Sequence, residues 1–188
     1  MDALRFPSLE CLSKQNVELI FKWLHDCDRT HIGCSVGEPP MLPTRVIDVG
    51  IASSESPKPY LLCSDGLEGR YVALSHCWGT PSASNPGFKT ETHNYAMMQA
   101  GIVFESMPPL FRDAVVTTWK LGIHYLWIDS ICIIQDSKED WEAESAKMGS
   151  VYRNAYVTIA ASVPRSQATF QATNITQHIG NRRQPKLP

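Results

Sequence analysis

The chain lacks the features that would place it in a membrane or outside the cell. None of its apolar runs approaches the roughly 18 residues that a membrane-spanning helix needs. Its amino terminus has no charged segment followed by an apolar stretch of signal-peptide length. We therefore expect a cytoplasmic protein without a membrane partner, whose six cysteines stay reduced rather than forming disulfides.

An excess of charge of one sign is also missing. The 17 basic and 19 acidic residues leave a formal net charge of −2, and no basic patch accompanies the tryptophans, which argues against nucleic acid as a partner. We expect all five tryptophans mainly in the core and over the sheet: Trp23, Trp78, Trp119, Trp127 and Trp141. No acidic residue follows Glu144, and we expect the polar stretch 164–188 to be mostly disordered.

The apolar residues that are present form three short runs, which predict strands at Tyr71–Ser75, Ile123–Ile128 and Tyr156–Ala161. The second run is nearly continuous in apolar residues, as in a parallel strand that is covered on both faces. Helical segments separate the runs. This alternation predicts an α/β protein with a doubly wound, mostly parallel sheet.

The helical segments have recognisable ends. One is predicted from Pro109 to Leu121, because proline suits a first turn and Gly122 can close the helix in a left-handed conformation. The other begins at a cap formed by Asp136 or Ser137 and runs to Tyr152. Its expected buried stripe consists of Trp141, Ser145, Met148 and Tyr152.

The first 69 residues predict a helix followed by an irregular segment. The helix begins after Ser13, and its apolar stripe consists of Val17, Ile20, Phe21 and Leu24. The irregular part contains two short strand candidates, Arg45–Val49 and Tyr60–Cys63. We accordingly divide the chain into a lead-in (1–69), an α/β core (70–163) and a polar tail (164–188).

Polar side chains follow the first two predicted core strands. The first strand leads into Ser75, His76, Cys77, Trp78 and Gly79, and the second into Asp129, Cys132, Gln135 and Asp136. Ligand crevices of open α/β sheets form at the carboxyl ends of the strands. We therefore expect these residues to line one crevice, and Glu144 on the next helix can approach it.

The thiol, imidazole and hydroxyl after the first strand do not make a convincing catalytic set. Neighbouring residues of a strand point to opposite faces, so His76 and Cys77 are poorly placed to share a proton. We favour a structural or ligand-lining loop. Gly79 either allows close backbone approach or simply ends the strand.

The polar residues after the second strand have structural alternatives. Asp129 is either an acceptor for a ligand hydroxyl or an acceptor for neighbouring backbone N–H groups, and the sequence leaves both open. For Gln135 we favour the anchoring of a turn. For Glu144 we favour a surface ion pair with Lys147, three residues later on the helix.

Cys27, His31 and Cys34 are spaced closely enough to hold a metal ion, with Cys63 or Cys77 as a fourth ligand. Structural zinc sites require four ligands, and this cluster lacks the paired Cys-x2-Cys knuckles of common zinc modules. We favour small buried thiols and a hydrogen-bonded histidine, and predict no metal.

The segments Tyr71–Gly79 and Leu121–Asp136 closely resemble the first two sequence blocks of the fungal heterokaryon-incompatibility (HET) domain. The resemblance covers most of residues 20–162. It continues through Trp141, Glu144, Met148 and Tyr152–Ala155.

This resemblance implies a role in non-self recognition, in which fusion of incompatible hyphae leads to programmed cell death. It also implies a fold similar to the Toll/interleukin-1-receptor (TIR) class of flavodoxin-like domains, some of which cleave NAD. HET domains normally continue into an Arg-x-Trp-x-x-Gln-Glu block, whose glutamate corresponds to the catalytic carboxylate of NAD-cleaving relatives. No tryptophan follows Trp141 and no acidic residue follows Glu144, so we expect an incomplete carboxy-terminal part.

Three functions are compatible with this pattern. We favour an interaction and signalling module whose partners are other HET-like or incompatibility proteins, including a second copy of itself. The alternative is an NAD-hydrolysing enzyme in which Ser75, Trp78 and Asp129 bind the nucleotide, although its catalytic carboxylate is missing. The third is an inactive truncated remnant. We assign no catalytic residue, and expect NAD to be bound, if at all, without turnover.

Overall fold

The computed structural model describes residues 13–31, 38–51, 55–78, 87–161 and 174–176. Their strands form one six-stranded sheet in the order β2-β1-β4-β3-β5-β6. The strands are β1 (Arg45–Asp48), β2 (Tyr60–Cys63), β3 (Tyr71–Ser75), β4 (Tyr125–Ile128), β5 (Val157–Ala160) and β6 (Asn174–Thr176). The three central strands β4, β3 and β5 run parallel, which confirms the three predicted core strands and their side-by-side arrangement.

The expectation of a mostly parallel sheet is wrong, because the sheet is mixed. β1 pairs antiparallel with both β2 and β4, and β6 pairs antiparallel with β5. The link between β1 and β2 is shorter than the dozen or so residues that a parallel crossover requires, so the two form an antiparallel pair that extends the sheet beyond β4. Both short strand candidates of the lead-in are thus confirmed. The sequence does not predict β6.

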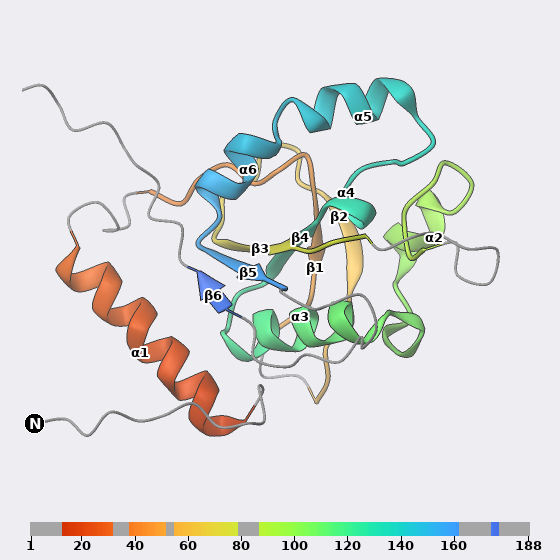
Figure 1. Cartoon of the computed structure of the whole chain (residues 1–188). Helices are drawn as coiled ribbons and strands as arrows, with labels where there is room; N and C mark the ends of the chain where they lie inside the picture. The colour runs from red at the N-terminus through yellow and green to blue at the C-terminus, as the bar shows by residue number, and fades with distance from the viewer. Residues whose placement is uncertain (1–12, 32–37, 52–54, 79–86, 162–173, 177–188) are drawn as a thin grey trace, which may run out of the picture.

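Helices cover both faces of the sheet (Figure 1), with α3 on one face and α4, α5 and α6 on the other. Their bounds are α1 (Lys14–Thr30), α2 (Tyr95–Ala100), α3 (Pro109–Lys120), α4 (Asp129–Cys132), α5 (Lys138–Ser145) and α6 (Met148–Asn154), and a single 3₁₀ turn, η1, spans Phe104–Ser106. The predicted start and end of α3 are confirmed. Gly122 has a φ of 67°, the left-handed conformation expected after the helix.

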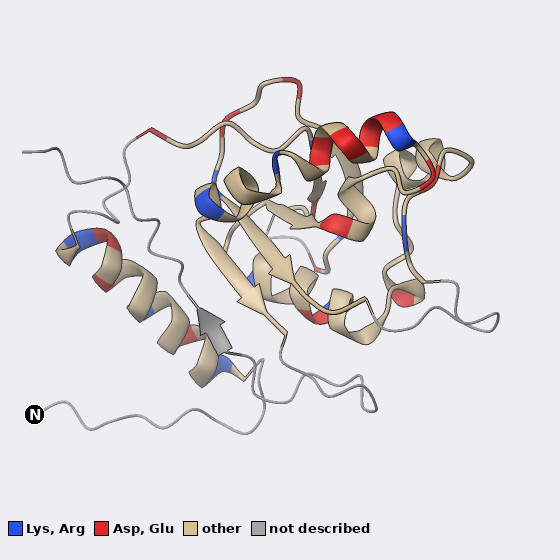
Figure 2. Cartoon of the chain, turned by 45° about the horizontal axis from the view of Figure 1, so that its top comes forward, with Lys and Arg blue, Asp and Glu red and all other residues tan. Residues whose placement is uncertain are grey.

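The single helix predicted to run as far as Tyr152 is wrong, because α5 and α6 are separate. Ser137 caps α5, accepting the backbone N–H of Asp140 at 3.2 Å. After α5 the backbone N–H of Lys147 donates to the carbonyl of Glu144 at 3.0 Å, a tight turn that changes the direction of the chain. Figure 2 shows that acidic residues, coloured red, make up much of α5.

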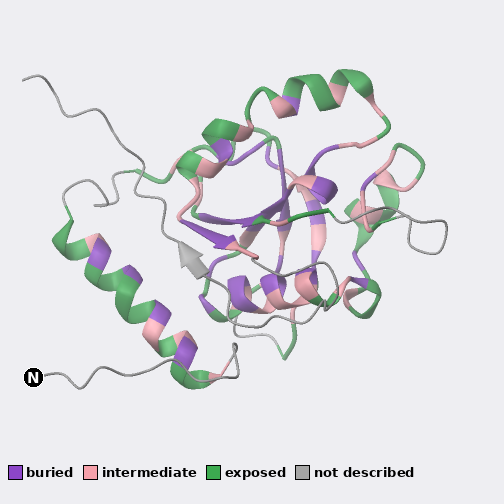
Figure 3. Ribbon diagram, viewed as in Figure 1, coloured by how far each residue is buried: buried purple, intermediate pink, exposed green. Residues whose placement is uncertain are grey.

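This change of direction alters which face is buried. Glu144 is 5% exposed, whereas Trp141, which the helical stripe places inside, is 52% exposed. Trp127 is buried and Trp119 half-buried, as expected, but Trp23 and Trp78 are also exposed. Figure 3 shows that the buried residues lie mainly in the strands and on the sheet-facing sides of the helices.

The carboxyl end of α1 is tied to the amino-terminal ends of β3 and β5. The Tyr156 hydroxyl donates to Asp28 Oδ2 at 2.9 Å, and Arg70 forms an ion pair with the same oxygen at 3.6 Å. The Arg70 guanidinium also lies 4.5 Å from the centre of the Tyr156 ring. The inward face of α1 is Asn16, Ile20, Leu24 and Cys27, so Ile20 and Leu24 are buried as predicted and Phe21 is not.

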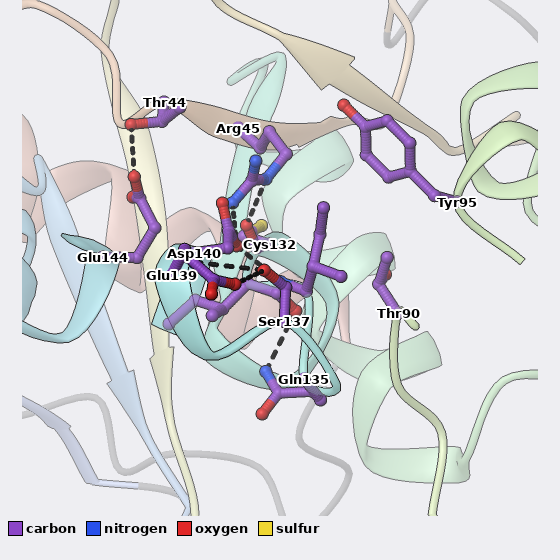
Figure 4. A network of polar contacts seen from close by, with 12 residues as sticks. Thr44, Arg45, Thr90, Tyr95, Cys132, Gln135, Ser137, Glu139, Asp140 and Glu144 are labelled. Carbon is purple, nitrogen blue, oxygen red and sulfur yellow. Dashed lines mark hydrogen bonds and ion pairs between the residues drawn. The ribbon is translucent and has the colours of Figure 1, made fainter. Parts of the chain in front are cut away.

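An ion pair between the buried Arg45 and the partly buried Asp140 joins β1 to α5 (Figure 4). Arg45 donates from Nε to the carbonyl of Cys132 at 2.7 Å and from Nη2 to Asp140 Oδ2 at 2.5 Å. The same carboxylate oxygen accepts the backbone N–H of Ile134 at 2.8 Å. Burial lowers the pKa of Arg45, but the hydrogen bond and charge of Asp140 outweigh it and raise the pKa above its ordinary value.

Substitution Asp140→Ala is expected to lower the free energy of unfolding by about 3–5 kcal/mol, because it leaves the Arg45 charge buried without its counter-ion. The measurement is urea unfolding followed by circular dichroism. The matched control is Glu142→Ala on the same helix, whose exposed carboxylate forms only a 3.8 Å surface pair and should change stability by no more than about 0.5 kcal/mol. Equal effects of the two substitutions would contradict the importance of the Arg45–Asp140 pair.

Candidate functional site at the carboxyl ends of β3 and β4

The carboxyl ends of β3 and β4 lie side by side, because Leu74 pairs with Ile128 in parallel register. The residues that follow each strand meet there. The Trp78 indole Nε1–H donates to Asp129 Oδ2 at 2.6 Å, and His76 Nδ1 lies 3.7 Å from Asp129 Oδ1. We call His76, Trp78 and Asp129 the β3–β4 rim.

Asp129 connects the rim to the first turn of α4. Its Oδ1 accepts the backbone N–H of Ser130 at 2.7 Å, and its side chain is 15% exposed. The carboxylate therefore accepts from the backbone, as one of the two alternatives requires, and also from the Trp78 side chain. Gln135 donates from Nε2 to the carbonyls of Asp129 and Ile133, both at 3.0 Å, which is the contact of a turn anchor.

His76 is the most enclosed of the three rim residues. Its ring packs edge-on against Phe111 of α3, with centroids 5.0 Å apart, and lies nearly parallel to the Trp78 ring at 6.5 Å. Burial lowers the pKa of His76, and the negative charge of Asp129 offsets only part of this effect. The imidazole is therefore mainly neutral at pH 7. Its buried Nδ1 has no hydrogen-bond partner within the described part of the chain.

The remaining candidate residues that follow β3 and β4 differ in how exposed they are. Ser75 and Cys77 are exposed, and Gly79 lies outside the described residues. Cys132 is buried in α4, and burial raises the pKa of its thiol to about 12. A thiol that stays protonated is a poor nucleophile, so Cys132 contributes to packing and not to reactivity at the rim.

Asp136 holds a neighbouring segment rather than lining the rim. Its Oδ1 accepts the backbone N–H of Thr92 at 2.7 Å and the Thr92 hydroxyl at 3.0 Å, and the backbone hydrogen bond lowers the pKa of Asp136. The adjacent Thr90, fully buried, donates from its N–H to Ser130 O at 2.9 Å and from its hydroxyl to Ile131 O at 2.6 Å. The sequence does not predict these hydrogen bonds between Thr90 and α4, because no local motif marks Thr90.

Glu144 does not form the surface pair that the sequence suggests. It does contact Lys147, with Nζ 2.9 Å from Oε1, but its side chain is buried, and the same oxygen accepts the Thr44 hydroxyl at 2.8 Å. Glu144 lines a groove between the segment before β1 and the helices α5 and α6. That groove includes none of the rim residues.

Of the three closely spaced ligand types that the sequence offers, only Cys27 and His31 lie within the described residues. His31 Nδ1 lies 3.3 Å from Cys27 Sγ, and Cys34 lies outside the described range. Among the residues the structure describes, no group of three or more His, Cys, Asp or Glu could hold a metal ion.

Three comparisons with known proteins bear on this geometry. The model of the family described as heterokaryon incompatibility protein (HET) matches residues 71–186, more than half of the chain. No curated protein and no solved structure matches the chain. The expected likeness to TIR and flavodoxin-like domains therefore stays a prediction. No helix in the described part of the chain is long and apolar enough to cross a membrane.

The lowered pKa of His76 predicts a loss of stability in mild acid. An unfolded histidine has a pKa of about 6.5, so below that pH the unfolded chain binds more protons than the folded one. The contribution of His76 should be complete above about pH 7, fall as the pH drops through 6.5, and level off below the folded pKa.

Substitution His76→Gln should make this decline shallower in urea unfolding measured at a series of pH values. The control is His93→Gln, which removes a histidine whose side chain is 73% exposed. The prediction fails if the pH dependence is the same in His76→Gln as in the unmodified protein.

Proposed function

The chain belongs to the heterokaryon incompatibility (HET) family, and we propose that it acts as an interaction module of non-self recognition that binds other HET-like domains through the β3–β4 rim. The observation that supports this proposal is that the Trp78 side chain is exposed and at the same time held in one position. Its ring is 50% exposed, although its indole N–H is held by Asp129 at 2.6 Å.

An aromatic side chain that is both exposed and held in place suits a binding surface. Tryptophan is enriched among the residues that contribute most to protein–protein affinity, and a preorganised side chain loses little conformational freedom on binding. Trp141 provides a contrast, because it is 52% exposed and its indole makes no hydrogen bond to any described residue. Exposure alone therefore does not distinguish Trp78, but its anchored indole does.

The proposed partners are other incompatibility proteins with a HET-like domain, including a second copy of this chain. The proposed outcome of the association is programmed cell death in fungal cells that have fused with an incompatible partner. The family match supports the incompatibility role. The hydrogen-bonded, exposed Trp78 supports recognition of the partner through direct contact with this side chain.

A second candidate is the binding of NAD at the same rim. Its support is the position of Trp78 and Asp129 at the carboxyl ends of two parallel strands, where nucleotides bind in open α/β sheets. The Trp78 ring can stack on a base, and Asp129 can accept a ribose hydroxyl. The parallel core β4-β3-β5, with helices on both faces, is compatible with the TIR-like arrangement that the resemblance implies.

Turnover of NAD requires more than this site offers among the described residues. Both oxygens of Asp129 already accept hydrogen bonds, Asp136 holds Thr92, and Glu144 lies in the separate groove. Loss of a general acid or base lowers a rate by about 10²–10⁴-fold. We therefore propose binding without hydrolysis as the form of this candidate.

Substitution Trp78→Ala should weaken association with a second copy of the chain by at least about tenfold, the effect typical of a central tryptophan in an interface. Sedimentation of the full chain over a range of concentrations measures it. Trp141→Ala, which removes an equally exposed tryptophan, should leave association unchanged. A monomer at all concentrations, or equal weakening by the two substitutions, contradicts recognition through Trp78.

For the second candidate, NAD should quench tryptophan fluorescence in the unmodified protein and not in Trp78→Ala, and no nicotinamide should be released. Chromatography of the same mixture measures nicotinamide. Release that disappears in Asp129→Asn would instead show an NAD-hydrolysing enzyme and replace the module as the proposed function.

A further inference from the structure

A groove with a volume of about 410 Å³ lies apart from the β3–β4 rim. Its walls come from the segment before β1, the turn after β2, the end of α5 and helix α6. Its polar side chains include Thr44, Ser64, Asp65, Glu144, Lys147 and Asn154. We call it the Glu144 groove.

Glu144 supplies a buried carboxylate with one oxygen still available. Its Oε1 accepts the Thr44 hydroxyl at 2.8 Å and the Lys147 ammonium at 2.9 Å. Figure 4 shows the Glu144 side chain directed toward Thr44. Its Oε2 makes no hydrogen bond to any described residue. This oxygen is not one of the enclosed polar atoms that lack a partner, so it is accessible from the groove, and a ligand that offers an O–H or N–H gains a charged hydrogen bond there.

The charges of the groove exclude several ligand classes. An anion would meet the carboxylates of Glu144 and Asp65. An ammonium group would compete with Lys147 Nζ, which already donates to Glu144 and, at 3.1 Å, to Thr44. A purely apolar ligand would cover Glu144 Oε2 without donating to it, which is unfavourable.

A neutral polyol fits what remains. Hydroxyl groups both donate and accept, so one hydroxyl can donate to Glu144 Oε2 while its neighbour accepts from the third N–H of Lys147. Asp65 and Asn154, whose side chains make no hydrogen bond to any described residue, offer a further acceptor and a further donor at the edge. The buried Leu42, Pro43 and Val151 provide an apolar wall for ring carbons.

We propose that the Glu144 groove binds the vicinal diol of a sugar ring, either a free or glycosidic pyranose or the ribose of a nucleoside. The volume is within the few hundred Å³ common for small-molecule sites. This inference goes beyond the proposed function, and neither depends on the other, because the groove is not lined by His76, Trp78 or Asp129.

Saturation-transfer NMR on the full chain tests the ligand class with methyl α-glucopyranoside, adenosine, 2′-deoxyadenosine and cyclohexanol. Binding of the glucoside supports a pyranose. Binding of adenosine without 2′-deoxyadenosine supports a ribose diol. The proposal is overturned if neither binds, if adenosine and 2′-deoxyadenosine bind equally without the glucoside, or if cyclohexanol binds as well as the diols.

Variants then locate the binding. Glu144→Gln should weaken affinity by at least about tenfold, because it replaces a charged acceptor by a neutral amide. Glu142→Gln, an exposed change on the same helix, should not alter affinity. Ser150→Phe places a ring in the groove from the exposed side of α6 and should also abolish binding, so it decides the question if Glu144→Gln does not fold. Unchanged affinity in Ser150→Phe, with folding verified by circular dichroism, overturns the assignment of this groove.

Discussion

The ion pair between Arg45 and Asp140 is the interaction on which the positions of both sites depend. The guanidinium holds the carboxylate of α5 and the carbonyl of Cys132, which is the last residue of α4. Because α4 begins with Asp129 and α5 contains Glu144, this contact with β1 sets where both carboxylates lie. A charged side chain is stable away from water only when it is paired with an opposite charge. The arrangement of α4 and α5 on the sheet is therefore sensitive to the loss of this one pair.

The acidic side chains of this region are largely occupied in holding other groups. Asp129 accepts an indole and a backbone N–H, Asp136 accepts from Thr92, and Asp140 accepts from Arg45 and Ile134. Glu144 accepts from Thr44 and Lys147 through Oε1, and its Oε2, which has no donor among the described residues, belongs to a side chain that lines the groove. The rim therefore presents an aromatic surface supported by a carboxylate, which suits recognition, whereas the groove presents a carboxylate oxygen, which suits a hydroxyl ligand.

The sequence predicts what is local and misses what is distant. β3, β4, β5 and α3 follow from short apolar runs and from Pro109 and Gly122, which mark helix ends within a few residues. The meeting of Trp78 and Asp129 also follows, since parallel strands bring their carboxyl ends to one edge. The burial of Glu144 and the pairing of Asp140 with Arg45 could not be predicted, because the partners Thr44 and Arg45 lie about a hundred residues earlier. The local pattern selects β1 as a strand but not its antiparallel pairing with β2 and β4, and it does not select β6, which pairs antiparallel with β5.

The state of His76 bears on how the rim would respond to a partner. A second molecule that covers Trp78 would remove the remaining water from Asp129 and so strengthen the hydrogen bond from the indole, since such bonds are stronger where the dielectric is low. The same desolvation would further disfavour a charged His76, whose pKa burial already lowers. A neutral imidazole beneath the ring leaves the Asp129 charge to the indole and the Ser130 N–H. The rim thus combines one negative charge, two donors and an uncharged aromatic support, an arrangement that needs little rearrangement when it is covered.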